Sequence, residues 1–127
     1  MQNIKETFGS YSTDDVFKAK DFYGEKLGLK VELDERMGNL IVHSNNKKTM
    51  IYPKESHTPA EFTVLNFIVD DVEKTVDELT GDGITFEQYE GDIKTDEKGI
   101  SRNEGVTVAW FKDPAGNILS IVEDYKI

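Results

Sequence analysis

The sequence predicts an α+β fold made of two βαβββ modules in one chain. The main observation is an internal repeat, because residues 14–21 (DDVFKAKD) match residues 70–77 (DDVEKTVD) at five of eight places. Each copy follows an extended segment, residues 7–13 in the first half and 62–69 in the second. Each copy also precedes three strand-like segments, so the two halves share one design.

The paired aspartates predict the start of a helix in each half. An Asp side chain accepts hydrogen bonds from the free N–H groups of a first turn, and its charge suits the positive end of the helix dipole. Apolar residues recur at helical spacing after Asp15 as far as residue 27, and again after Asp71. Gly28 is expected to end the first helix, and Gly81 or Gly83 the second.

The remaining apolar segments are predicted strands bounded by turn residues. Residues 113–117 (DPAGN) are typical of a tight reversal before the last strand, and residues 91–105 are expected to form a long polar loop that serves either as a lid or as a solvated surface loop. The predicted strands that follow the helices are residues 29–33, 40–43 and 49–52 in the first half, and 84–89, 106–111 and 118–122 in the second.

Composition and charge narrow the classes of function. The 127 residues carry 15 Lys and Arg against 25 Asp and Glu, a formal net charge of −10, which disfavours nucleic acid and anionic membrane surfaces as partners. There is no cysteine for a disulfide or a thiolate site, and no apolar run is long enough to span a bilayer. The N-terminus has no signal-peptide pattern, so a cytoplasmic protein is expected.

Three motifs together resemble the vicinal oxygen chelate superfamily, which includes glyoxalase I, bleomycin-resistance proteins and extradiol dioxygenases. They are Asp-Val…Phe-Tyr…Leu-Gly within residues 15–28, Val-Asp-Asp-Val at 69–72, and Trp-Phe-Lys-Asp-Pro-Ala-Gly-Asn at 110–117. The resemblance implies curved mixed sheets around a cleft. It also implies that residues 1–127 are one domain of two repeats, about 4–53 and 62–124, joined by a short linker.

The resemblance also locates the metal ligands of the enzymes in the superfamily. Those places fall on Phe8 and Val64 in the first strands, on Ser120 in the last, and on Met50 or Tyr52 in the fourth. Phe and Val cannot bind a metal, and Ser is not a usual ligand in such a site. We therefore expect no metal and no cofactor, and no metal-dependent glyoxalase or dioxygenase chemistry.

Strand alternation predicts which side chains would line the cleft. Asn66 interrupts an apolar run, and we interpret it either as a ligand contact or as an amide bonded to backbone or to Ser10. Trp110 is either core or a platform for a ligand. His57 in the linker and Arg102 in the long loop are candidates for contact with a ligand, Arg102 with an anionic one. The predicted ligand-binding residues are Phe8, Ser10, Tyr52, His57, Asn66, Arg102, Trp110 and Ser120.

The sequence thus favours a metal-independent protein that binds a small molecule in an apolar and aromatic cleft, with sequestration, as in bleomycin-resistance proteins, as one form of this role. A homodimer is expected, as in many relatives. Two alternatives stay open. The first is an enzyme, either a glyoxalase-like lyase or isomerase or a relative of the dioxygenases. The second is a protein-interaction module. No catalytic residue is assigned, because no serine has a neighbouring His and acid in the sequence.

Overall fold

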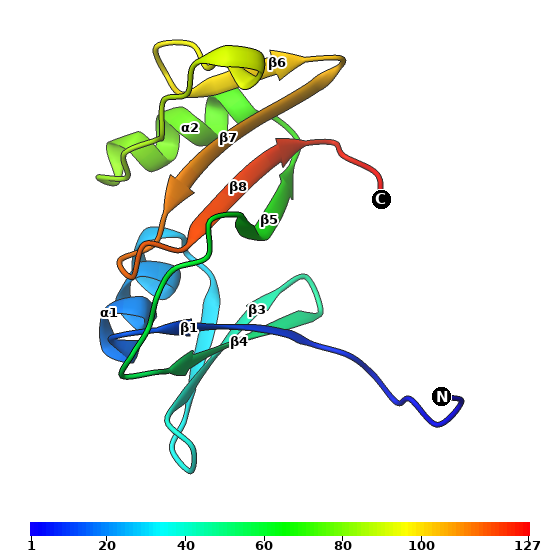
Figure 1. Cartoon of the computed structure of the whole chain (residues 1–127), viewed down its shortest axis with the longest axis vertical. Helices are drawn as coiled ribbons and strands as arrows, with labels where there is room; N and C mark the ends of the chain where they lie inside the picture. The colour runs from blue at the N-terminus through cyan, green and yellow to red at the C-terminus, as the bar shows by residue number, and fades with distance from the viewer. The chain divides into compact units, whose positions relative to one another are not determined.

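The structure, a computed structural model, describes all 127 residues and contains two compact units, Met1–Thr58 and Pro59–Ile127. Each unit holds one four-stranded mixed sheet and one α-helix, which confirms the predicted α+β fold of two βαβββ modules (Figure 1). None of the helices is both long and apolar enough to cross a membrane.

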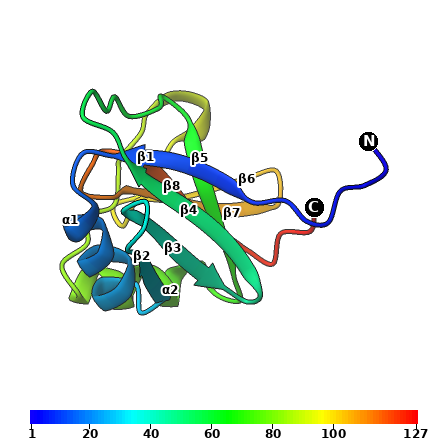
Figure 2. The ribbon, with the colours of Figure 1, turned by 90° about the horizontal axis from the view of Figure 1, so that it is seen from below.

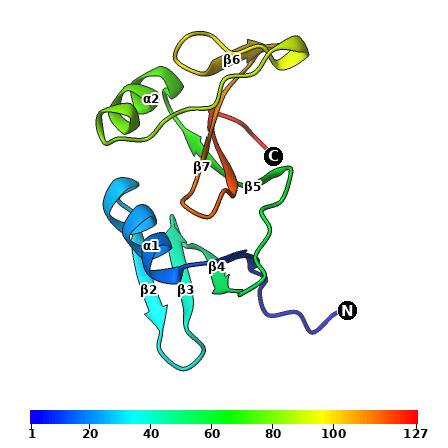
Figure 3. The same ribbon diagram turned by 60° about the vertical axis from the view of Figure 1, so that its left-hand side comes forward.

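The first unit has the strand order β1-β4-β3-β2, and Figure 2 shows these strands side by side. Strand β1 runs parallel to β4, and the other neighbours are antiparallel. Residues 1–8 form no helix or strand and lead away from β1 (Figure 3). The strands are β1 (Gly9–Thr13), β2 (Lys30–Asp34), β3 (Asn39–Ser44) and β4 (Lys47–Pro53).

The second unit repeats this order as β5-β8-β7-β6, with β5 parallel to β8. Helix α2 (Val72–Gly81) lies on one side of this sheet (Figure 1). Its strands are β5 (Thr63–Val69), β6 (Ile100–Asn103), β7 (Val106–Lys112) and β8 (Ile118–Glu123).

Both predicted helix starts are confirmed. Asp15 accepts from the backbone N–H groups of Phe17 and Lys18 at 3.1 Å, and Asp71 accepts from that of Lys74 at 3.0 Å. The first helix differs from the expected single helix over residues 16–27. Helix α1 (Val16–Asp21) continues into one π-helical turn, Phe22–Lys26.

The π turn places two adjacent aromatic residues in the core. Phe22 and Tyr23 are both buried and meet edge to face, with ring centroids 5.3 Å apart. The Tyr23 hydroxyl lies 2.7 Å from that of Tyr11 on β1, so neither buried hydroxyl lacks a partner. The wider π turn allows both neighbouring rings to be buried. Apolar spacing in the sequence does not reveal this turn.

The expected strand over residues 84–89 is wrong. Only Phe86 makes an isolated bridge to Phe111, and the edge of the second sheet is formed instead by β6, inside the segment expected to be a loop. A tight turn at Glu104 and Gly105, both with positive φ, joins β6 to β7. The chain reaches β6 because Gly99, at φ +88°, packs directly on Phe86.

Each helix covers one face of its own sheet. In the first unit Tyr11, Leu40, Val42 and Ile51 are buried on that face. In the second unit the equivalent core residues are Ala109, Phe111, Leu119 and Ile121. Because strand side chains alternate, the residues between them point to the other face of each sheet, which we call the distal face.

The turn before β6 provides a test of the second unit. A Cβ at Gly99 would lie 2.7 Å from the Cβ of Phe86 and 3.1 Å from the carbonyl oxygen of Glu87, whereas a Cβ at Gly105 meets nothing within 4 Å. Both residues have positive φ, so Gly105→Ala should cost about 1 kcal/mol of backbone strain and Gly99→Ala about 3 kcal/mol, since overpacking adds to the strain. Urea unfolding followed by circular dichroism measures both losses. Equal losses in the two variants would contradict this packing.

Candidate functional site

The distal face of the second sheet carries three predicted site residues in one row. Asn66 on β5 pairs in register with Ser120 on β8, and Ser120 pairs with Trp110 on β7. Ser120 is only 1% exposed, and its hydroxyl donates a hydrogen bond of 2.5 Å to the Asn66 side-chain oxygen. The structure therefore brings together Asn66, Ser120 and Trp110, and Ser120 rather than Ser10 is the partner of the Asn66 amide.

An aromatic pair ends this row. The ring of Tyr89 meets that of Trp110 edge to face, with centroids 5.5 Å apart. Burial, and to a smaller extent the carboxylate of Glu87, raises the pKa of the Tyr89 phenol above 10, although Lys112 acts in the opposite direction. The phenol therefore stays neutral at physiological pH and offers a hydrogen-bond donor next to the indole.

The distal face of the first sheet carries the other group of predicted residues. Ser10 lies beside Met50, and Ser12 lies beside Tyr52, across the β1–β4 pair. The Ser12 hydroxyl oxygen lies 2.7 Å from Nδ1 of His57, a residue 45 positions further along the chain. Sequence reasoning named His57 but not Ser12 as its partner, because only the fold brings the linker back to β1.

A hollow of about 760 Å³ lies on this face, within the first unit. It is lined by the segment that enters β1, including Phe8, and by residues of β2, β3 and β4. Its volume is in the range of pockets that hold small molecules. Sequence reasoning missed most of the lining residues, among them Glu32, Ile41, His43, Lys47 and Lys48.

Arg102 lies away from the row of Asn66, Ser120 and Trp110. Its neighbour in register on β7 is Thr107, which alternates with the distal Trp110, so Arg102 points to the face of the sheet that α2 covers. There its guanidinium contacts Asp96 at 2.8 Å and Glu73 of α2 at 3.4 Å.

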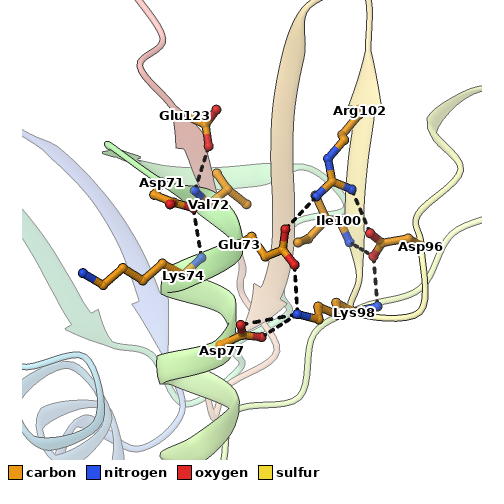
Figure 4. Close-up of polar contacts among 10 residues, drawn as sticks. All are labelled: Asp71, Val72, Glu73, Lys74, Asp77, Asp96, Lys98, Ile100, Arg102 and Glu123. Atoms are coloured by element: carbon orange, nitrogen blue, oxygen red, sulfur yellow. Dashed lines mark hydrogen bonds and ion pairs between the residues drawn. The ribbon is translucent and has the colours of Figure 1, made fainter.

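These contacts belong to a network that holds residues 96–102 against α2 (Figure 4). Lys98 contacts Glu73 at 3.0 Å and Asp77 at 3.1 Å, and hydrogen bonds to these two carboxylates raise the pKa of its ammonium group. Asp96 also accepts from the backbone N–H groups of Lys98 and Ile100. The part of residues 91–105 around β6 is thus held against α2 by the side chains of Lys98 and Arg102, while Asp96 holds the segment together internally.

The chain holds no cluster of metal-binding side chains, since nowhere do three His, Cys, Asp or Glu side chains come together as a group able to hold a metal ion. The positions where the sequence resemblance leads us to expect ligands are occupied by Phe8, Val64 and Ser120. The histidines do not supply a ligand set either, since His43 lies beside Glu32 alone and His57 beside Ser12.

Comparison with known proteins decides the family. The Glyoxalase/Bleomycin resistance protein/Dioxygenase superfamily matches residues 7–121, nearly the whole chain. The chain belongs to this superfamily. No curated protein sequence matches it.

Solved structures of this superfamily share the fold. A member from Sphaerobacter thermophilus is 23% identical with a TM-score of 0.73, over 95% of this chain and 98% of that one. A protein described as a glyoxalase family member from Bacillus anthracis is 20% identical with a TM-score of 0.72, over 98% and 100%. Lactoylglutathione lyase from Agrobacterium tumefaciens is 19% identical with a TM-score of 0.66, over 97% and 96%.

Asp96 provides a test of the network that holds β6. Burial alone would raise the pKa of its carboxyl, but the N–H of Ile100, the Arg102 guanidinium and the N–H of Lys98 outweigh burial and hold the pKa below its usual value. A lowered pKa stabilises the fold above about pH 4, and the stabilisation is lost as the pH falls through the lower folded value.

We expect Asp96→Asn to lose about 1 kcal/mol at pH 7, a modest value because the side chain is partly exposed and screened by solvent. The loss should shrink below pH 4 as the wild-type carboxyl is protonated. Chemical denaturation at pH 7 and pH 3 measures it. The control is Asp92→Asn, which removes a neighbouring charge outside the network. A loss independent of pH would show that the carboxylate charge contributes nothing.

Proposed function

We propose that this superfamily member is a metal-independent protein that binds a small molecule on the distal face of a sheet. The observation that carries the proposal is the row of Asn66, Ser120 and Trp110. The sequence resemblance places an acidic ligand of the family's enzymes at Ser120, and the Ser120 hydroxyl donates its hydrogen bond to the Asn66 amide oxygen.

The chemistry of the row supports a neutral binding site. The Asn66 oxygen accepts from Ser120, and the amide nitrogen donates to no group of the chain. Asn66 is exposed, so its N–H groups face solvent, where a carbonyl or hydroxyl oxygen of a ligand would accept from them. Trp110 and Tyr89 add aromatic surface nearby, a combination typical of small-molecule sites.

The other predicted site residues enter the proposal through the first unit. Phe8 lines the hollow, while Ser10, Tyr52 and the pair of Ser12 and His57 lie on the same sheet face. We keep a cytoplasmic homodimer as part of the proposal, on the grounds given by the sequence. Sequestration of the ligand is a role that needs no metal.

The metal content of the protein is the first test. Protein purified without chelator should contain far less than one equivalent of zinc, nickel, manganese or iron, because hydrocarbon and hydroxyl side chains stand at the ligand places. Elemental analysis measures the content, and thermal unfolding with and without EDTA should give the same midpoint. A stoichiometric metal whose removal lowers the midpoint would disprove metal independence.

Binding on the second sheet is tested with the only tryptophan of the chain, Trp110. Small molecules released by denaturing natively purified protein are identified by mass spectrometry and titrated back while Trp110 emission is followed. Asn66→Ala should weaken binding about fivefold, the effect of one lost hydrogen bond. Thr107→Ala, on the helix-covered face of β7, should leave the affinity unchanged. The proposed binding is contradicted if no molecule is released, or if Asn66→Ala and Thr107→Ala have the same affinity for the released molecule.

A further inference from the structure

The hollow of the first unit contains a polar atom without a satisfactory partner. Nε2 of His43 is buried and makes no aligned hydrogen bond, although Oε1 of Glu32 lies 2.6 Å away as a potential ion pair. Buried polar groups are normally hydrogen-bonded, so this one requires an explanation. The Glu32 side chain is 57% exposed, and an exposed side chain moves at little cost. Its carboxylate is therefore a displaceable neighbour of the ring nitrogen.

The surroundings of His43 combine positive charge with apolar surface. Lys48 pairs with His43 across β3 and β4, and neither Lys48 nor the adjacent Lys47 forms an ion pair in a chain with ten excess acidic residues. One row further along the face, Ile41 lies beside Met50. The hollow thus has a cationic end and an apolar floor, with Phe8 as an aromatic wall and Glu6 as its other acidic residue.

We propose that this hollow binds a small molecule with an apolar body and an oxyanion head group, a carboxylate or a phosphate monoester. The head group takes the place of the Glu32 carboxylate at His43 Nε2 and lies near Lys48, while the body covers Ile41 and Met50. The inference deepens the proposed function and rests on it, since it names the chemistry of a ligand for a binding protein. In the unliganded protein, Glu32 occupies the place of the ligand's anion.

The probes are 2-naphthoate, 2-naphthyl phosphate, the neutral 2-naphthamide and the small anion acetate. Binding is measured from amide chemical shifts in ¹H–¹⁵N spectra of the full chain. We expect one of the two naphthyl anions to shift the amides of Gly9, Ile41 and Thr49, and to bind at least about fivefold more tightly than the amide or acetate. The stronger of the two identifies the head group as carboxylate or phosphate.

Two variants with matched controls test the residues. Glu32→Gln removes the competing carboxylate and should tighten naphthyl anion binding about threefold, whereas Glu35→Gln, which removes an equal charge in the turn after β2, should not. The double variant Lys47→Gln/Lys48→Gln should weaken binding about fivefold. Its control, Lys20→Gln/Lys26→Gln, loses the same charge from the helical segment and should bind as the wild type does.

The opposite results would overturn the inference. It is wrong if 2-naphthamide binds as tightly as the anions, if Glu32→Gln weakens binding, or if the control double variant loses as much affinity as the lysine pair. It is also wrong if the anions shift only amides of the second unit. The Trp110 titration decides the proposed function independently of these results. The proposed function stands if released molecules change Trp110 emission, and it is wrong if they do not.

Discussion

The alternation of side chains along each strand is the constraint on which the rest of this structure depends. One set of side chains must be apolar because a helix covers it, and the core residues of both sheets obey this demand. The other set is free of that helix and can vary. Consequently the polar side chains of Ser10, Asn66 and Ser120 lie on the distal faces, where the fold places fewer demands on them.

The two units use the same local interactions but end in different surfaces. Asp15 and Asp71 begin equivalent helices, and each helix covers its own sheet. In the second unit β6 takes the sheet position that β2 has in the first, but a longer connection leads to it from the helix, and the contacts of Asp96, Lys98 and Arg102 hold it against α2. Charged residues thus stabilise the helix side of the second unit, and its distal row stays neutral. In the first unit the charged residues Glu32 and Lys48 lie on the distal face.

Local signals in the sequence were sufficient for the helix starts, the glycine after the first helix and most strands, because caps and turns depend on neighbouring residues. The π turn and β6 depend on contacts between distant residues. Tyr23 needs Tyr11, and Gly99 needs Phe86, so periodicity could not reveal either feature. Once β6 was expected to be a loop, the face to which Arg102 points could not be derived.

The candidate site was predictable only in part for the same reason. Alternation correctly placed Asn66 and Ser120 on one face, whereas the pairs of Ser12 with His57 and of Glu32 with His43 require the register of separate strands or the path of the linker. His43 carried no signal in the sequence because its neighbour Glu32 is eleven positions away on another strand.

Net charge is a poor guide to what such a protein attracts, because the local arrangement of charges decides it. The excess of acidic residues suggests a cationic ligand only if the cationic residues are all paired with carboxylates. Lys98 and Arg102 are paired in this way and contribute to stability. Lys47 and Lys48 are not, and Lys48 is the cross-strand neighbour of His43, whose buried imidazole nitrogen has one exposed acidic neighbour, Glu32. At distances beyond about 10 Å the acidic surface repels an anion, but salt screens that repulsion, while the contacts inside the hollow act at short range and favour it.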